Sequence, residues 1–528
     1  MLSDSKRGTL WQAVAMLVLL LSGCSTVGPD FVRPKAEVSQ NWMVAGDKQV
    51  KSESADYRMW WQVFNDPVLD RLIDRAFQEN LSLRMAGVRV LEARAQLGIA
   101  TGKLYPQTQQ AFGSLEEIRV SARSPVAAPG AQLDYRQAEI GVQASWELDF
   151  WGKFRRAIES ANASWLATIA DYDNVLVSLT ADVANAYILI RTLERRIGIA
   201  LQNVETQRES LKIAEAKLYY GTASQLDVEQ AKTVLNDTLA SIPSLETQLR
   251  QAKNGLSILL GLPPAGTDEL LTGASEIPVS PPEVVVGIPA DLLRRRPDIR
   301  SVELQAEAQS ALIGVAKADL YPAFSLTGTF GFLSSDVGKF SLGDMFQWKS
   351  RTGQIGPSLQ WNIFNYGRIT NNVRVQDARF EQLLIAHQSA VLKAQQEVED
   401  GLIAFLKAQE RADFLAQSTA AAKRAFDLAV LQYREGTKDF TTVLVAQQAL
   451  LSEQDNLATT LGNISSNLVG VYRALGGGWE IREGRELVPP EMTEEMAKRT
   501  KWGRLLAPAS YNPLAAEESK SFIRPPDW

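Results

Sequence analysis

Cysteine and histidine are almost absent from this chain, which has one of each in 528 residues. One cysteine cannot form a disulfide framework, and the two residues are too few for a His/Cys metal cluster. A Cys/His or Ser/His/Asp nucleophile is excluded as well, unless it uses His387. We therefore expect no catalytic residue, no metal site and no cofactor, and the sequence does not favour an enzyme.

An excess of positive charge is also lacking, because 55 Lys and Arg stand against 61 Asp and Glu, giving a formal net charge of -6. A surface that binds nucleic acid needs clustered Lys and Arg, so nucleic acid is not an expected partner. The hydrophobic share of 45% is nevertheless enough for a large core and excludes a disordered protein.

Hydrophobic runs long enough to span a bilayer are missing near the N-terminus. The apolar run 10–21 follows two basic residues, is too short to span, and is typical of a signal peptide. It ends in Leu21-Ser22-Gly23-Cys24, which resembles the bacterial lipobox. An uncleaved anchor with a chance cysteine is the alternative, but the only cysteine falls at the cleavage position. We expect acylation of Cys24, and the resemblance to bacterial lipoproteins implies that Ser25, in place of an Asp, directs the protein to the outer membrane.

Internal similarity is what the chain has in abundance, with a constant shift of about 215 residues. The landmarks that share this shift are Leu104-Tyr105-Pro106 and Leu320-Tyr321-Pro322, Trp146 and Trp361, Gly152 and Gly367, Gly221-Thr222 and Gly436-Thr437, and Gly261 and Gly476. We therefore expect a signal peptide 1–23, an N-terminal extended segment 24–61, repeat one 62–265, a linker 266–289 that includes the Pro-rich stretch 277–289, repeat two 290–478 and a polar tail 479–528.

Alternation of apolar and polar residues over 137–150 predicts a β-strand with one apolar and one polar face. Residues 324–332 and 354–363 show the same alternation, whereas 107–120 alternate only weakly. Each half thus offers a hairpin. The chain offers about four strands, each long enough to cross a bilayer.

Helical periodicity covers most of the remaining sequence. Residues 66–103 predict a helix that Asp66 caps. The tracts 153–220 and 368–434 lack proline, and each would extend about 100 Å at 1.5 Å per residue. Glycine ends each tract, and residues 226–260 and 441–475 are again helical and suited to folding back. Helices this long must lie against neighbours, so we expect two antiparallel helical hairpins.

Four amphipathic strands cannot be stable in lipid with open edges, because each unpaired backbone group costs several kcal/mol. They must close into a barrel, and since such a barrel needs at least about eight strands, copies must associate; three copies give about twelve. The alternative is a soluble sheet covered by helices, but helices of about 100 Å extend far beyond a sheet of about 35 Å. We predict an α+β membrane protein with a polar, water-filled bore.

The sequence then resembles the outer membrane factors related to TolC and OprM, in particular their lipoprotein branch, over nearly the whole mature chain. The residues that carry the resemblance are Cys24 with Val27-Gly28-Pro29-Asp30-Phe31, Trp60-Trp61 with Phe64-Asn65-Asp66-Pro67-Val68-Leu69, Trp146-Glu147-Leu148-Asp149-Phe150-Trp151-Gly152-Lys153, Arg294-Arg295-Arg296-Pro297-Asp298-Ile299, and Ile313-Gly314-Val315-Ala316 with Tyr321-Pro322. The resemblance implies a trimer whose twelve-stranded β-barrel continues as an α-helical barrel into the periplasm.

The resemblance also implies that the turns of the two helical hairpins form a periplasmic tip that meets a membrane fusion (adaptor) protein. These turns fall at Gly221-Thr222 and Gly436-Thr437. The alternative is that each glycine only supplies the left-handed conformation of a helix C-terminus. Because the dipeptide occurs at the matching place in both repeats, we favour docking in addition to capping.

Family members commonly close the tip just after this turn, often with an Asp ring in a Leu-Leu-Asp-Ala-Gln context. This sequence departs from that pattern and has Val443-Leu444-Val445-Ala446-Gln447. We hypothesise a hydrophobic constriction near Thr441 and Val445, with Asp227 as the nearest acid in the first repeat. The alternative is that Val445 is ordinary helix-packing surface.

Rings of carboxylates make a pore favour cations, and Glu139, Glu147 and Asp149 are the candidates for such rings in the barrel lumen. Scattered solvated acids are the alternative account. We expect residues Arg294 to Arg296 to form a solvated loop or a structural ion-pair site, and His387 to lie on the surface.

The leading functional hypothesis is an outer membrane channel of a tripartite efflux system, a passive export duct for drugs or other small molecules. Its expected partners are two further copies of the chain, outer membrane lipid, a periplasmic adaptor protein and an inner membrane pump of the resistance-nodulation-division (RND) type. The exit duct of a type I protein secretion system shares this fold and is one alternative. A non-conducting, lipid-anchored envelope spacer is another, although a spacer would have no need for polar strand faces.

Overall fold

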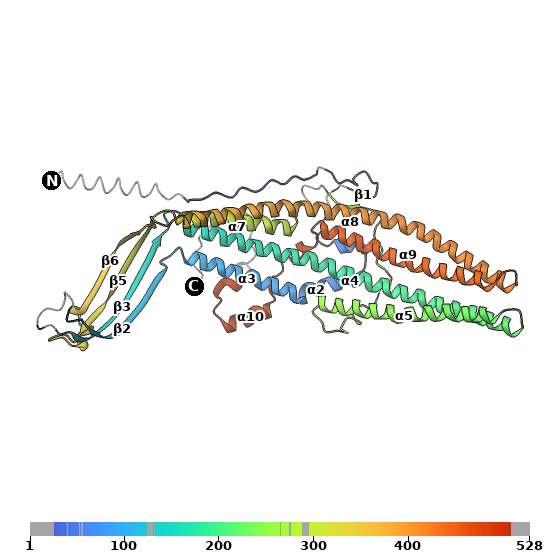
Figure 1. Cartoon of the computed structure of the whole chain (residues 1–528), viewed down its shortest axis with the longest axis horizontal. Coiled ribbons are helices and arrows are strands. Elements are labelled where there is room, and N and C mark those ends of the chain that lie inside the picture. The colour runs from blue at the N-terminus through green and yellow to red at the C-terminus, as the bar shows by residue number, and fades with distance from the viewer. Residues whose placement is uncertain are drawn as a thin grey trace.

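The structure is a computed structural model that describes residues 26–507 except 40, 52, 54–55, 124–129, 131, 265, 274–275 and 288–294. The signal peptide, Cys24, Arg294 and the end of the C-terminal tail therefore lie outside the described residues. Figure 1 shows an elongated molecule with strands at one end, packed helices in the middle and the turns of two helical hairpins at the other end.

Apart from the helix Pro67–Glu79, which belongs to the first half, the two halves contain the same elements in the same order in the part of the chain that the structure describes. The first half consists of α2 (Pro67–Glu79), α3 (Leu81–Gly102), β2 (Thr108–Arg119), β3 (Asp134–Leu148), α4 (Lys153–Tyr219) and α5 (Gln225–Leu259). The second half consists of α7 (Pro297–Ala318), β5 (Ala323–Ser335), β6 (Arg351–Gln360), α8 (Arg368–Arg434) and α9 (Phe440–Ala474). Both long helices have 67 residues and both return helices have 35, so the predicted tandem repeat of strands and helical hairpins is confirmed.

The remaining elements lie outside these two series. The 3-10 helix η1 (Trp60–Phe64) precedes α2, and the pair η2 (Leu342–Phe346) and η3 (Trp348–Ser350) lies between β5 and β6. The C-terminal segment contains η4 (Trp479–Arg482), α10 (Pro490–Arg499) and η5 (Gly503–Leu506). Two short strands, β1 (Val50–Lys51) and β4 (Val284–Val285), pair in parallel and join the N-terminal segment to the linker.

Local hydrogen bonds repeat between the two halves as closely as the elements do. The indole nitrogen of Trp146 donates to the carbonyl of Leu104 at 3.0 Å, and that of Trp361 donates to Leu320 at the same distance. Gly152 and Gly367 both adopt positive φ angles, 75° and 82°, directly before the long helices. The landmarks found in the sequence are therefore the residues that end strands and start or stop helices.

The helix predicted over 66–103 is interrupted in the structure. Asp66 caps its start as expected, because its carboxylate accepts a hydrogen bond from the Val68 amide at 2.8 Å. Asn80 then adopts an extended conformation, and its side-chain oxygen caps α3 through the Leu83 amide at 2.9 Å. Asn80 also donates to the carbonyl of Leu259 at the end of α5, a tertiary contact that the helical period does not reveal.

The strands form one antiparallel sheet in the order β2-β3-β5-β6, so β2 and β6 are its two edges. Because residues directly opposite each other share a face, the register defines two faces. The apolar face carries Ile140, Val142, Trp146, Leu326, Phe330, Ile355 and Leu359, all exposed in the single chain. The predicted alternation is confirmed, with boundaries shifted: β3 ends at Leu148 and β6 ends at Gln360.

Helix α4 is the central element of the helical part and packs against α3, α5, α7 and α9. Among the described helices it alone has a stretch apolar enough to cross a membrane, but 67% of that stretch is buried inside the protein. Arg196 of α4 forms a bidentate ion pair with Asp455 of α9, at 2.7 and 3.0 Å. Asn203 donates to Gln454 at 2.8 Å, so polar as well as apolar contacts join the two helical hairpins.

The C-terminal segment is fixed to α4 by a buried ion pair between Arg482 and Asp173, which are 9% and 1% exposed. Burial raises the pKa of Asp173 to about 6, although the Arg482 guanidinium works in the opposite direction. Removal of one partner from a buried pair leaves an uncompensated charge. The segment is therefore part of the folded body rather than a free tail as far as residue 507.

A close approach of α9 to α4 leads to a first prediction. A Cβ atom added at Gly462 of α9 would overlap the Thr192 hydroxyl of α4, whereas one added at Gly470 meets nothing within 4 Å. We expect Gly462→Ala to destabilise the protein by about 1–3 kcal/mol through overpacking. Gly470→Ala, the matched control, should stabilise it by about 0.5–1 kcal/mol through helix propensity. Thermal unfolding measures both, and equal effects would contradict the packing.

Candidate functional site

The polar face of the sheet is continuous across all four strands. From β2 to β6 the register brings together residues such as Gln110, Gln143, Thr329 and Gln354. The Gln143 side chain donates to that of Gln110 at 2.8 Å. Lys and Arg are absent from this face in the four strands, which are described in full. The face is thus hydrophilic with acidic charge only, as a cation-favouring water-filled bore would require.

Glu139 and Glu147 both lie on this polar face. Glu139 is directly opposite Ser114 of β2 and Leu333 of β5. Glu147 is opposite Ser325 at the helical end of β3, and the Lys153 ammonium lies 3.7 Å from its carboxylate. Lys153 forms a shorter ion pair of 3.0 Å with Asp319, so the charge of Glu147 is partly compensated.

The structure corrects the placement of Asp149. It lies beyond the end of β3, and its carboxylate accepts hydrogen bonds from the amides of Phe154 and Arg155 at 2.9 and 3.0 Å. The Arg155 side chain binds the same carboxylate at 3.0 Å, and the Asp149 side chain is 7% exposed. Asp149 therefore caps the start of α4 and does not face the lumen; the strand ended two residues before the alternation suggested.

Glu116 is a polar-face acid that the sequence did not single out. It lies on β2 directly opposite Gln137, next to the Ser114–Glu139 pair. Its neighbour Glu117 is opposite Arg136 on the apolar face instead. The weak alternation of β2 hid this distinction, because Phe112 occupies a polar-face position there, and only the register with β3 assigns the two glutamates to opposite faces.

The two hairpin turns are nearly identical in their hydrogen bonds. Gly221 and Gly436 have φ angles of 71° and 75°. The Thr222 amide donates to the Lys217 carbonyl at 2.8 Å, and the Thr437 amide donates to Gln432 at 3.0 Å. Each Thr hydroxyl donates to the same carbonyl at 3.1 Å. The dipeptides therefore terminate their helices as capping requires.

The surface at these turns is open. An added Cβ at Gly221 or Gly436 meets nothing within 4 Å, so the glycines are exposed at the tip. Tyr219 and Tyr220 next to the first turn are 84% and 77% exposed. The Lys217 ammonium lies 4.9 Å from the ring centre of Tyr433, which connects the end of α4 to the end of α8. The turns combine a rigid backbone with an uncovered aromatic surface.

The three constriction candidates have different environments. Thr441 and Val445 lie one turn apart on the exposed side of α9, and Val445 is 62% exposed. Their neighbours Val443 and Leu444 point inward and pack in a cluster with Val228 of α5. Asp227 is half-buried and belongs to a capping box, since its carboxylate accepts from the Ser224 amide at 3.1 Å. Of the three candidates, Asp227 is the one whose carboxylate is already hydrogen-bonded at the start of its own helix.

The described part of the N-terminal segment is held at the junction of sheet and helices. The Val27 amide donates to the Trp151 carbonyl at 3.0 Å, and Arg156 binds Asp30 at 2.6 Å. Gly28 and Gly314 approach so closely that a Cβ on Gly28 would overlap the Gly314 backbone. These contacts bring together three of the segments that carry the family resemblance, those that contain Gly28, Trp151 and Gly314. Cys24 itself lies outside the described residues.

Aromatic side chains surround this junction. Trp151 stacks on Tyr321 with ring centres 4.7 Å apart, while Trp361, Phe364 and Tyr366 are exposed. Tryptophan and tyrosine are enriched where a membrane protein meets the interface between lipid and water. The junction therefore has the composition of one membrane boundary.

Two predictions about charged residues have different outcomes. Arg296 is 7% exposed and forms ion pairs of 2.8 Å with Asp298 and Glu397, so the ion-pair interpretation is confirmed for this residue. The expectation that His387 lies on the surface is wrong. It is 4% exposed, and burial lowers its pKa. The N-terminal segment covers this part of α8, which no sequence pattern in α8 could show.

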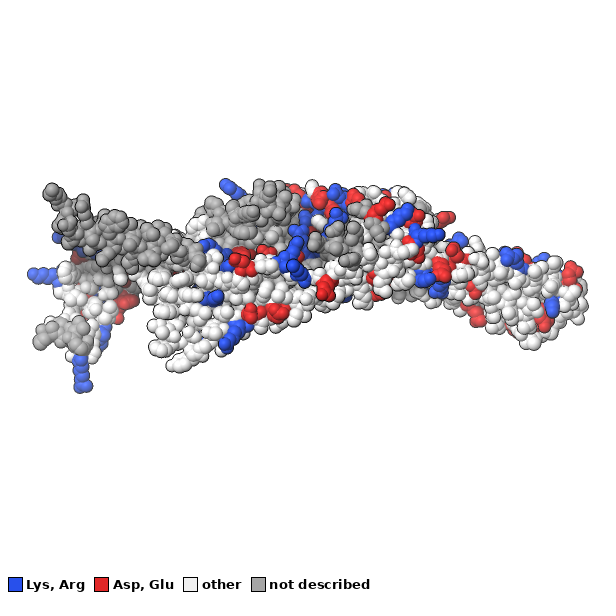
Figure 2. All heavy atoms as spheres, turned by 90° about the horizontal axis from the view of Figure 1, so that it is seen from above, with Lys and Arg blue, Asp and Glu red and all other residues white. Residues whose placement is uncertain are grey.

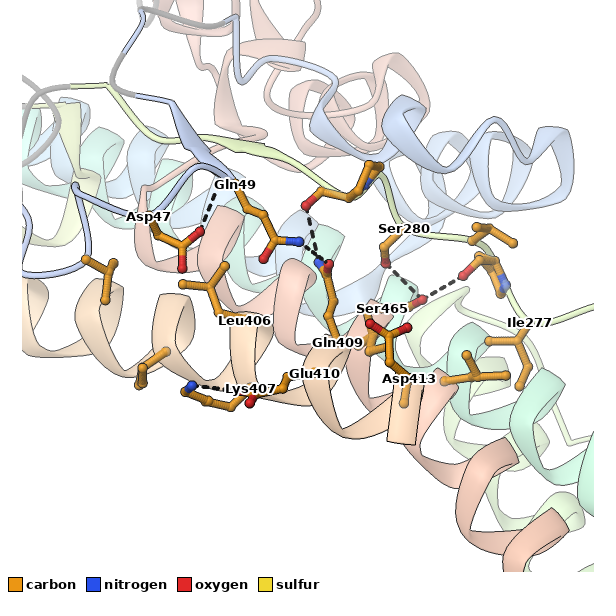
Figure 3. Close-up of a pocket in the computed structure, with 18 of the residues that line it drawn as sticks. Asp47, Gln49, Ile277, Ser280, Leu406, Lys407, Gln409, Glu410, Asp413 and Ser465 are labelled. Atoms are coloured by element: carbon orange, nitrogen blue, oxygen red, sulfur yellow. Dashed lines mark hydrogen bonds and ion pairs between the residues drawn. The ribbon is translucent and has the colours of Figure 1, made fainter. Parts of the chain in front are cut away.

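A cavity of about 920 Å³ lies midway along the molecule, between the N-terminal segment, the linker and helices α8 and α9 (Figure 3). Its polar groups bind each other: Gln49 donates to Gln409 at 2.9 Å, Ser280 donates to Ser465 at 3.1 Å, and Lys407 pairs with Glu410 at 2.7 Å. These contacts join three parts of the chain, and the cavity is accordingly a structural junction.

Comparison with known proteins places these features in a family context. The family described as outer membrane efflux protein matches residues 72–262 and 288–477. The chain is 30% identical over 476 residues to the solvent efflux pump outer membrane protein SrpC of Pseudomonas putida, covering 88% of this chain and 98% of SrpC. It is 32% identical over 475 residues to the pyoverdine export outer membrane protein OpmQ of Pseudomonas aeruginosa, covering 88% and 95%.

Solved structures show the same architecture. The outer-membrane channel OprN aligns with a TM-score of 0.78 and 32% identity, over 86% of this chain and 99% of OprN. CusC, whose structures concern transmembrane channel formation, aligns with a TM-score of 0.73 and 27% identity, over 86% and 100%.

The position of Asp149 leads to a second prediction. Asp149→Ala removes the carboxylate that accepts from two backbone amides and pairs with the Arg155 side chain, so it should destabilise the protein by about 1–3 kcal/mol in thermal unfolding. Glu147→Gln, two residues earlier, leaves all backbone hydrogen bonds in place and should change stability by less than about 0.5 kcal/mol. A destabilising Glu147 variant beside a neutral Asp149 variant would refute this assignment.

Proposed function

The chain belongs to the outer membrane efflux protein family, and from this premise we propose how its residues form and operate an export channel. It is an outer membrane component of an efflux pump and works with a periplasmic adaptor and an inner membrane pump. Its family is one of channels, and we propose that the chain contributes no chemistry of its own. The observation that carries the proposal is the four-stranded sheet with one polar and one apolar face.

Closure of the barrel follows from the two free edges, β2 and β6. Inside a membrane each unpaired backbone group on these edges would cost several kcal/mol. We propose that β2 of one copy pairs with β6 of the next, so that three copies form a barrel of about twelve strands. The apolar face then meets lipid and the polar face lines the bore. The helical hairpins continue the same tube into the periplasm.

An acyl chain on Cys24 would supplement this barrel. Cys24 precedes Val27 by three residues, which span at most about 11 Å of extended chain. Val27 is bound to Trp151 at the aromatic junction, so the lipid would enter the membrane close to the periplasmic boundary of the barrel. Because the barrel itself is apolar outside, we propose that the anchor aids targeting more than retention.

We expect the exported compounds to be small molecules, because relatives of this chain export small molecules. The two relatives named above are components of solvent and pyoverdine export, and this chain covers nearly their full length. This similarity favours a drug or small-molecule duct over the exit duct of a protein secretion system. The continuous polar face of the sheet favours a conducting channel over an inert spacer.

The hairpin turns are the proposed docking site for the adaptor. Leu in place of both Gly221 and Gly436 adds bulk to the open tip at a strain of about 1–2 kcal/mol per site. We expect the double variant to abolish drug resistance in cells while trimer remains in the outer membrane. Asn at the same positions tolerates positive φ and serves as the control for capping. Loss of trimer with Leu, but not with Asn, would show that the glycines act in folding alone.

The exposed pair Thr441 and Val445 is the proposed constriction, in which apolar side chains of three copies exclude water. Val445→Asp places a carboxylate at a position that is 62% exposed, so the fold should tolerate it. We expect higher single-channel conductance from the purified trimer in a planar bilayer, because a charged ring keeps water in the pore. Val445→Leu should not raise conductance. Unchanged conductance in the Asp variant would count against the constriction, and a wild-type trimer that never conducts, even after the tip is opened, would count against the channel.

Selectivity is the third property that the geometry predicts. With Glu116, Glu139 and Glu147 on the polar face, the reversal potential under a salt gradient should indicate a preference for cations. Replacing Glu116 and Glu139 by Gln should move that potential toward zero. Asp149→Asn should leave it unchanged, because that carboxylate is inside a helix cap. A wild-type reversal potential near zero would mean that these acids are merely solvated.

A further inference from the structure

The loop between β5 and β6 carries an aromatic surface at the end of the sheet farthest from the helices. Phe340, Phe346 and Trp348 are 69%, 75% and 66% exposed. The Trp348 ring lies 6.5 and 6.4 Å from those of Phe330 and Phe332, which are on the apolar face of β5. The loop is therefore folded back over the outside of the sheet, on the side that meets lipid in the closed barrel.

Positive charge accompanies these rings. Arg351, the first residue of β6, is paired with Phe332 and so belongs to the apolar face. Its guanidinium lies 5.0 Å from the Trp348 ring centre and donates to the Trp348 carbonyl at 2.8 Å. Lys339 and Lys349 are exposed in the same loop. Figure 2 shows Lys and Arg side chains projecting from this end of the molecule.

The two acids of this loop accept hydrogen bonds from neutral groups, one from the backbone of β3 and one from within the loop. Asp336 accepts from the Arg136 amide at 2.6 Å. Asp344 accepts from the Ser341 amide at 3.0 Å and from the Gln347 side chain at 2.6 Å. The cations of the neighbouring strands each have an acid nearby. Arg119 is 3.6 Å from Asp134, and Arg136 is directly opposite Glu117. Residues 336–351 thus carry three cations, Lys339, Lys349 and Arg351, against two acids, a net charge of +1, and in the part of the chain that the structure describes none of the three forms an ion pair.

A cation on the outer face of a barrel is tolerated near the membrane boundary and costs about 2–4 kcal/mol at the midplane. Arg351 and the aromatic rings beside it therefore lie at the height of the lipid headgroups. A guanidinium and two ammonium groups at that height complement a phosphate, which Arg binds in a bidentate manner. The loop thus offers apolar contact for acyl chains directly below a positively charged surface.

We propose that the surface formed by Lys339, Trp348, Lys349 and Arg351 binds a phosphate-bearing lipid headgroup of the outer leaflet. The proposal rests on the barrel inferred above. The rings contact the upper acyl chain region, and the three cations contact the phosphate. Because each protomer has one loop, a trimer presents three such sites around the barrel, away from the bore. The loop would then fix the barrel's depth and rotation against one class of lipid.

The test is native mass spectrometry of the purified trimer in detergent with diphosphoryl lipid A as the probe. A surface cation contributes a factor of roughly five to lipid affinity. Lys349→Gln with Arg351→Gln should therefore weaken binding by about thirtyfold. Lys339→Gln with Lys349→Gln should have a similar effect while it preserves the contact between Arg351 and Trp348. The matched control, Arg119→Gln with Asp134→Asn, removes a compensated pair and should leave binding unchanged.

Further arms separate the alternatives. Dephosphorylated lipid A and diacylglycerol, neither of which carries a phosphate, should bind at the level of the Lys349 and Arg351 variant. Equal binding of phosphorylated and dephosphorylated lipid would overturn the proposal, as would a double variant that binds like the wild type. Competition by millimolar inorganic phosphate alone would indicate an ion site and would also overturn it. Conductance of the same trimer in a planar bilayer tests the channel itself, so failure of the lipid site and failure of the channel are distinguishable.

Discussion

The need to pair every backbone hydrogen-bonding group inside a membrane is the constraint on which the rest of this structure depends. A four-stranded sheet has two edges, and in water those edges would be a modest liability. In lipid they forbid the isolated chain from spanning at all. The edge strands β2 and β6 therefore have unpaired backbone groups in the single chain, and they are the strands through which the copies assemble. The same constraint explains why apolar residues such as Val142 and Ile355, exposed in one chain, belong to a stable assembly.

The tandem repeat solves a geometrical problem that follows from closure. Two chain crossings per repeat return the chain to the helical side, so every long helix begins at the same boundary. Gly152 and Gly367 turn the chain there, and Gly221 and Gly436 reverse it at the far tip. Because the same caps occur in both halves, both hairpins reach the same depth. A common depth is what allows their turns to form one ring in a trimer.

Hydrophobic periodicity is sufficient to predict a helix or strand whose residues all follow one local pattern. The bounds of the long helices and return helices are predicted to within one residue, because their helical period is long enough to outweigh a single helix breaker such as Pro243 inside α5. The break at Asn80 was missed, since its cap is reinforced by a tertiary bond to Leu259. Asp149 was misplaced because alternation continued past the last strand pair, and His387 because the N-terminal segment covers it. Each error concerns a contact between segments far apart in the chain or a cap that outweighs a short pattern.

The two ends of the sheet differ in a way that bears on how the barrel is held. At the helical end two cations next to β3 form ion pairs: Lys153 pairs with Asp319, and Arg155 pairs with Asp149. The aromatic residues there contact the folded body, as Trp151 does through the carbonyl of Pro322. At the opposite end the Trp348 ring lies against Phe330 and Phe332 of β5, and Arg351 donates to the Trp348 carbonyl. The lipid site proposed above would give the outer end a preference for phosphate-bearing lipids, so that the two ends of the barrel would bind their leaflets differently. Such a difference fits a duct that must open outward while its helices remain in the periplasm.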